Sequence, residues 1–333
     1  MRVYIFKRLL LVLPTLIGIS LVVFTISQMI PGSPIAMQIY NLSQVGGPTV
    51  DTEEMARELM RQYDFDKPLP VRYLKWLGNM LTLDFGTSIK DNKPVWDKIA
   101  ERIPISLQLS FISLIMAYLI SIPLGVFSSV KQDSLTDKGL TVFLFTLYSL
   151  PNFWVASLLM MFLCGGDFLD LFPIAGLSSR GAANMGFFEW LADRIWHLVL
   201  PVTCLTYGSL AYLSRFAKSG MLEVLRQDYI TTARAKGLPE KTVIFKHAFR
   251  NSLIPIITLA ALLVPAMIGG SVIIETIFGI PGMGQMSFEA IQSRDYPLIM
   301  GITTVAAVLT LLGLLLSDIL YVLIDPRISF ENR

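Results

Sequence analysis

Six long apolar stretches without Asp, Glu, Lys or Arg constrain this chain more than any other feature. They cover residues 9–30, 105–130, 139–166, 195–214, 252–274 and 296–317. Each is long enough to cross a hydrocarbon core of about 30 Å, which takes about 20 helical residues. Only 16% of the residues are charged, against roughly 25% in a soluble globular chain. The sequence therefore predicts an all-α integral membrane protein with six transmembrane helices.

The first stretch follows the basic residues Arg2, Lys7 and Arg8. A cleaved signal peptide has a similar basic start, but its apolar core is only ~7–15 residues long. No clear cleavage site of small residues follows Ile30. We therefore expect a retained first span.

Basic residues are distributed unequally between the loops, and this predicts the orientation of the chain. With the N-terminus inside, segments 1–8, 128–138, 215–253 and 320–333 hold 15 Lys and Arg residues, whereas the two short outside loops hold three. Long loops cross the membrane largely regardless of charge, so the nine basic residues in 31–104 are not counted. Both termini are expected in the cytoplasm, and residues 51–63 are expected to form a surface helix in the outer loop.

The inventory of catalytic groups is nearly empty. The sequence has no G-x-x-x-x-G-K-[ST] phosphate loop, only two histidines, and two cysteines inside apolar spans. We therefore predict no enzyme, no catalytic residue, no metal site and no cofactor bound by this chain. A net charge of +2 gives no indication of nucleic-acid binding.

One polar stretch, Asp228 to Gly237, stands out between two apolar spans on the expected cytoplasmic side. Asp228 suits a helix N-cap, Gly237 suits the left-handed residue just past a helix end, and Pro239 can open the next helix. The pattern predicts a protruding helix of about 8 residues, roughly 12 Å long. It is shaped either for a groove on another protein or as a solvated connector.

Two acidic residues, Glu275 and Asp318, lie near the ends of spans. Each either reaches water at the interface or hydrogen-bonds to a neighbouring helix or subunit. Without an ion relay or a nucleotide site, the energy for transport has to come from a partner. Prolines in the spans permit kinks that rocking helices can use.

Taken together, the motifs resemble the inner-membrane permease subunits of ABC-type oligopeptide and dipeptide importers. The resemblance covers essentially the whole chain. It is carried by residues 30–34 (IPGSP), 64–70 (DFDKPLP), 84–88 (DFGTS), 229–237 (YITTARAKG), 247–255 (HAFRNSLIP), 275–284 (ETIFGIPGMG) and 318–327, which end on DPR. Residues 171–177 and 325–333 look more like the branch that includes microcin C and long-peptide uptake.

The resemblance implies an ABC importer type I permease fold in the bacterial inner membrane. Residues 1–104 would hold the first span and an extracytoplasmic loop, and residues 105–333 a five-helix core with a coupling loop at 215–253. The partners would be membrane lipid, a second permease, two ATP-binding subunits that hold ATP and Mg²⁺, and an extracytoplasmic peptide-binding protein.

The resemblance also assigns residues. The ATPase-coupling helix would comprise Asp228, Tyr229, Thr231, Thr232, Ala233, Arg234, Ala235, Lys236 and Gly237. Thr231 and Thr232 replace the Glu and the first Ala of the family's E-A-A-x-x-x-G loop, so we expect Arg234 and Lys236 to make the charged contacts. Structural or interface roles fall to Glu275, Pro281, Gly282, Gly284, Asp318, Asp325 and Arg327.

Three alternatives stay open at this point. The same family imports nickel complexes, glutathione and other small solutes. The chain could instead be a stand-alone channel or an ion-coupled carrier. A membrane enzyme would need an ionisable cluster at one membrane face, and we can assemble none from the sequence.

Overall fold

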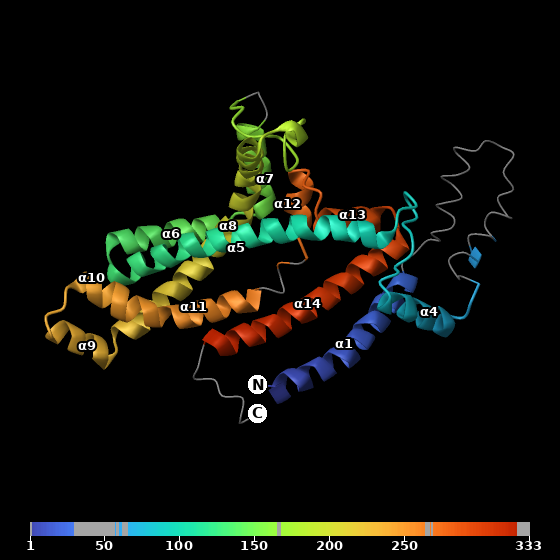
Figure 1. Cartoon of the computed structure of the whole chain (residues 1–333). Coiled ribbons are helices and arrows are strands. Elements are labelled where there is room, and N and C mark those ends of the chain that lie inside the picture. Colours follow the sequence, from blue (N-terminus) through green and yellow to red (C-terminus); the bar gives the residue numbers. More distant parts are fainter. Residues whose placement is uncertain are drawn as a thin grey trace. The chain divides into compact units, whose positions relative to one another are not determined.

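The computed structural model describes residues 2–29, 57, 60–61, 66–164, 168–263, 267 and 269–324. Most of the helix expected at 51–63 and the candidate residues Asp325 and Arg327 lie outside this part. Within it the chain is mainly helical (Figure 1). The α-helices are α1 (Arg2–Met29), α4 (Leu69–Leu81), α5 (Val95–Val130), α6 (Leu135–Ser149), α7 (Asn152–Leu163), α8 (Phe187–Leu225), α9 (Asp228–Ala235), α10 (Glu240–Thr242), α11 (Arg250–Leu263), α12 (Val272–Ile277), α13 (Met283–Gln292) and α14 (Tyr296–Ile324).

The chain divides into two compact units, which we describe separately. One comprises Met1–Pro104 with Gln285–Leu311, and the other comprises Ile105–Gly284 with Leu312–Arg333. In the first unit α4 packs on α1. The Tyr73 hydroxyl lies 2.9 Å from that of Ser20, and the Tyr73 ring meets Phe24 edge to face at 5.4 Å. An aromatic contact and a hydrogen bond thus hold the amphipathic α4 against the first span.

The first unit also contains a tight turn that precedes α5. The Ser88 amide donates to the Lys93 carbonyl, and Val95 donates to Gly86. The buried carboxylate of Asp295 accepts from the Ser88 hydroxyl and, at 3.2 Å, from the Ile89 amide. This aspartate therefore fixes the turn to the segment that precedes α14.

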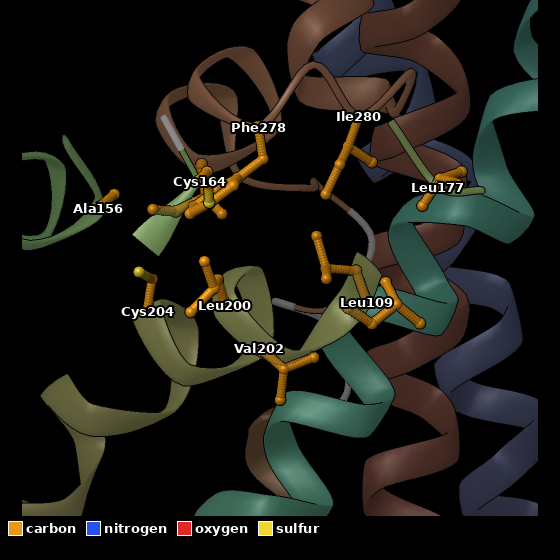
Figure 2. Packing of buried hydrophobic residues seen from close by; sticks show 11 residues of the cluster. Leu109, Ala156, Cys164, Leu177, Leu200, Val202, Cys204, Phe278 and Ile280 are labelled. Carbon is orange, nitrogen blue, oxygen red and sulfur yellow. The ribbon is translucent and has the colours of Figure 1, made fainter. Parts of the chain in front are cut away.

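Helix α8 is the centre of the second unit. It contacts α6, α7, α11 and α12 (Figure 1). A buried apolar cluster joins it to α5, α7 and the segment around α12, as Figure 2 shows for Leu109, Leu200 and Phe278. Both cysteines, Cys164 and Cys204, are free and buried in this cluster. Buried free cysteines of this kind pack as small apolar side chains.

Helices α5 and α14 are long and apolar enough to cross a membrane, and the pair α6–α7 makes a third such element if it forms one span. The expected span over 139–166 comprises two helices, because α6 and α7 meet at 91°. Pro151 lacks an N–H, and the residue before a proline is driven out of the α region. Leu150 accordingly has φ −78° and ψ 127°.

A second expected span, 252–274, is also interrupted. Helix α11 ends at Leu263 and α12 begins only at Val272, and Gly270 between them has φ +65°. The expected fourth span, 195–214, is part of the longer α8, which continues through Pro201. Membrane-buried proteins tolerate such breaks where other protein groups pair with the freed backbone.

Gly125 permits a close crossing of α5 and α8. A Cβ atom built there would lie 2.5 Å from the Ala217 Cβ and 2.6 Å from the Ser214 carbonyl oxygen. Small residues at such crossings let two helix backbones approach closely.

We expect Gly125→Ala to destabilise the protein by about 1–3 kcal/mol, because a backbone atom has to move to admit the methyl group. Gly139→Ala on α6 is the matched control, since a Cβ there meets no heavy atom within 4 Å. Thermal unfolding in detergent measures both variants. Equal melting temperatures for the two would contradict the close crossing.

Candidate functional site

Helix α9 (Asp228–Ala235) has the length expected for the protruding helix. Its start differs by one residue from the prediction. Gln227 is the N-cap, and its carbonyl accepts from the Ile230 amide at 3.0 Å. Asp228 is therefore not the cap but the first helical residue, where its carboxylate still interacts favourably with the positive end of the helix dipole.

The inner face of α9 is firmly anchored. Ile230 is fully buried and Ala233 is nearly so. They pack in a cluster with Val126 of α5, Met221 of α8, and Val243, Ile244 and Ala248 of the following π-helix, η2 (Val243–Phe249). Burying an isoleucine side chain contributes roughly 1.5–3 kcal/mol. These contacts join α9 to the C-terminal parts of α5 and α8.

The outer face of α9 is open. Every other residue assigned to the coupling helix is exposed, namely Asp228, Tyr229, Thr231, Thr232, Arg234, Ala235, Lys236 and Gly237. The Tyr229 hydroxyl accepts from the Asn251 side-chain amide at 2.9 Å. This bond ties the start of α9 to the first turn of α11.

The end of α9 is a Schellman motif, which satisfies its last carbonyl groups. The Gly237 amide donates to Arg234 at 2.9 Å and the Leu238 amide donates to Ala233 at 3.4 Å. Gly237 has φ +74°, and nothing lies within 4 Å of a Cβ built there. The requirement for glycine is thus conformational rather than steric.

The two cations of α9 differ in their surroundings. The Arg234 guanidinium pairs with the Glu240 carboxylate, with nitrogen–oxygen distances of 2.7 and 3.3 Å. That hydrogen bond lowers the pKa of Glu240 and raises the pKa of Arg234. Lys236 is exposed and makes no ion pair within the described part of the chain. Of the two residues assigned to partner contacts, Lys236 is the one left available.

Glu275, on α12, does not reach water: its side chain is fully buried. One carboxylate oxygen accepts from the Ser106 hydroxyl of α5 at 2.8 Å and from the Ser271 amide at 3.1 Å. The Ser106 hydroxyl in turn accepts from the Met283 amide at 2.8 Å. Of the two expectations for Glu275, the hydrogen bond to a neighbouring helix is the one found.

Glycines surround this carboxylate. A Cβ atom at Gly282 would fall on the Glu275 carboxyl group, and a Cβ at Gly284 would meet the Val272 amide nitrogen. Pro281 is half-buried in the same turn. The sequence ETIFGIPGMG thus forms a turn that closes over its own glutamate. Asp318 is half-buried on α14.

Two further polar groups have no motif in the sequence that marks them. The buried Asp137 of α6 pairs with Lys218 of α8 at 2.7 Å and accepts from the Ser128 hydroxyl of α5. Ser106 is one of several serines in the uncharged stretch 105–130, and nothing in the sequence distinguishes it from the others. Partners so far apart in sequence cannot be identified without the fold, although a lone charge at the end of an apolar stretch is a weak signal for a pair.

A cavity of about 230 Å³ lies between α5, α8 and the break after α11. Its walls are mainly small or polar and are formed by Ser110, Ser113, Leu114, Ala117, Leu205, Ser209, Leu263, Met267, Gly270 and Ser271. No group of three His, Cys, Asp or Glu side chains able to hold a metal ion occurs among the described residues.

Comparison with known proteins places this geometry in context. Residues 121–330 match the model of a family described as binding-protein-dependent transport system inner membrane component. The chain is 41% identical over 331 residues to the oligopeptide transport system permease protein AppB of Bacillus subtilis (strain 168), covering 99% of this chain and 100% of that one. It is 36% identical over 368 residues to the inner membrane ABC transporter permease protein YejB of Escherichia coli O157:H7, covering all of both.

A solved structure supports the fold. A chain of the MetNI methionine ABC transporter in an inward facing conformation matches with a TM-score of 0.53 and 15% identity. The match covers 68% of this chain and 96% of that chain.

Replacing Ser106 tests the hydrogen bonds around Glu275. Ser106→Ala removes the donor to the carboxylate and the acceptor for Met283, and we expect a loss of about 1–3 kcal/mol in unfolding free energy. Ser157→Ala is the control, because that exposed hydroxyl bonds only to the Phe153 carbonyl of its own helix. Similar thermal unfolding of the two variants would show that the Glu275 bonds contribute little.

Proposed function

This chain belongs to the family of binding-protein-dependent transport system inner membrane components, and we propose that it forms half of the translocation path of an ABC importer for peptides. It is a multi-pass protein of the bacterial inner membrane. A second permease would complete the path, two ATP-binding subunits with ATP and Mg²⁺ would drive it, and an extracytoplasmic binding protein would deliver the substrate.

One observation carries the coupling part of this proposal. Helix α9 exposes its outer face, while Ile230 and Ala233 fix its inner face to α5 and α8. A groove on an ATPase subunit can hold such a helix, and closure of the ATPase pair would move it as a rigid element. The buried contacts would then pass the movement to both helices, which is the rocking that alternating access requires.

The charges on α9 suggest how the contact is divided. Arg234 pairs with Glu240 and would restrict the movement of the segment that follows α9. The exposed Lys236 would instead be able to pair with an acidic group on the ATPase subunit. Exposed ion pairs contribute only about 0–1 kcal/mol. The shape of α9 and the buried contacts of Ile230 and Ala233 would therefore transmit the force. The charges would determine how α9 is positioned along the groove of the ATPase subunit.

We assign the substrate path to the cavity between α5, α8 and the break after α11. Its serines and glycine offer few specific contacts, which suits a path for peptides of varied side chains. Specificity would then reside in the binding protein. Relatives are named for oligopeptide and dipeptide transport, and import of another small solute, such as a nickel complex or glutathione, is the alternative.

The proposed topology has six spans, both termini in the cytoplasm, and residues 1–104 as a first span with its outer loop preceding a core at 105–333. Glu275, Pro281, Gly282 and Gly284 would close the outer end of this core. Asp318, Asp325 and Arg327 would lie at its cytoplasmic end. The charge distribution of the loops supports this orientation.

The coupling role of α9 is tested at Gly237. Val resists positive φ, at a cost of roughly 1–2 kcal/mol, so Gly237→Val should reduce substrate-stimulated ATP hydrolysis of the reconstituted complex by about tenfold. Gly237→Asn is the matched control, since asparagine tolerates this conformation. Full stimulation in Gly237→Val would argue against the coupling role. Transport by the chain alone in liposomes, without ATPase subunits, would favour a channel or carrier.

The orientation is tested at Ala235, which is exposed on α9. In Ala235→Cys, produced without the ATPase subunits that would cover α9, a membrane-impermeant thiol reagent should label the cysteine in inverted vesicles and not in intact cells. Cys164 and Cys204 are buried and give a low background. Labelling from outside intact cells would overturn the topology and with it the coupling role.

A further inference from the structure

A second cavity, of about 370 Å³, lies between α5, α6 and α8, away from the proposed path. Its wall has two chemically distinct parts. The apolar part is formed by Leu124, Leu140, Leu144, Phe145, Ala211 and Leu222, and the polar part by Ser128, Thr141, Ser214, Arg215, Lys218 and Ser219. A cavity with both kinds of wall suits an amphiphile.

The polar part carries excess positive charge. Lys218 is neutralised by Asp137, whose two oxygens each lie 2.7 Å from the ammonium group. Asp137 also accepts from the Ser128 hydroxyl and the Asp133 amide, so its carboxylate is fully used. Arg215 is exposed and has no carboxylate partner in the described ranges. No acidic residue lines the cavity.

An unpaired hydroxyl lies beside this cation. Ser214 is 4% exposed, and its Oγ has no hydrogen-bond partner among the described residues. A buried hydroxyl without a partner costs about 1–3 kcal/mol. A ligand that brings hydrogen-bond acceptors into the cavity would remove that cost, and a phosphate oxygen is such an acceptor.

We propose that this cavity binds an anionic phospholipid of the cytoplasmic leaflet. The phosphate would lie at Arg215, with Ser214 and Lys218 beside it, and an acyl chain would lie along Leu144 and Phe145. The apolar wall favours a lipid over free phosphate, and basic pockets between helices on the cytoplasmic side are known to bind anionic head groups. The assignment to the cytoplasmic leaflet rests on the proposed topology, whereas the choice of an anionic phospholipid rests on the residues that line the cavity.

The site is positioned to affect transport. Two residues after Ser219 on α8, Met221 packs in the cluster that anchors Ile230 of α9. Lys218 joins α8 to α6 through Asp137. A lipid in the cavity would therefore stiffen the part of α8 that receives the movement of α9.

The assembled complex, purified in detergent, is titrated with phosphatidylglycerol or phosphatidylcholine, and bound lipid is counted by native mass spectrometry. We expect preferential retention of phosphatidylglycerol, and about a fivefold weaker affinity in Arg215→Gln, since a single cation near the membrane surface contributes on this scale. Arg215→Lys should keep most of the affinity. Because Arg215 is exposed and unpaired, these variants should fold normally.

Lys138→Gln is the control for general attraction to anionic lipid, because Lys138 is exposed on α6 but does not line the cavity. Equal loss in Lys138→Gln and Arg215→Gln, or unchanged binding in Arg215→Gln, would overturn the proposal. Displacement of the lipid by inorganic phosphate alone would overturn the lipid assignment in favour of a soluble anion. These outcomes are separate from the Ala235→Cys labelling, which tests the topology and the proposed function.

Discussion

Backbone N–H and C=O groups have no water to bond with inside a membrane, so every break in a helix there must be covered by other protein groups. The structure meets this constraint at two breaks. Where α6 ends before Pro151, the Leu150 carbonyl accepts from the Tyr207 hydroxyl of α8. Beyond α11, the Glu275 side chain accepts from the Ser271 amide, and the Ser106 hydroxyl accepts from the Met283 amide. Tyr207 of α8 thus covers the break between α6 and α7, and Ser106 of α5 helps to cover the break after α11.

Helix α8 contacts most elements of its unit, and its C-terminal end packs against Ile230 of α9. The same stretch of α8 carries Lys218, whose ion pair with Asp137 fixes α6. Force applied at α9 and a ligand bound beside Lys218 would therefore act on the same few turns of one helix.

Sequence reasoning was accurate where the signal is local. It predicted the length of α9 and the left-handed conformation of Gly237, because a short run of helix-forming residues is followed closely in the chain by a glycine. It placed the N-cap one residue late, since Gln227 accepts through its carbonyl and needs no capping side chain. It missed Ser106, Asp137 and Lys218, whose partners are distant in sequence.

The sequence by itself determined the membrane class, the apolar segments, the protruding helix and the resemblance to a permease, because hydropathy and motif order are written along the chain. Tertiary structure decided which segments bend and which polar groups are buried. The 91° bend at Pro151 and the burial of Glu275 both depend on partners that the fold supplies. A carboxylate near a span end reads the same in sequence whether it meets water or a serine hydroxyl, and only the packing of α5 against the turn after α12 distinguishes the two.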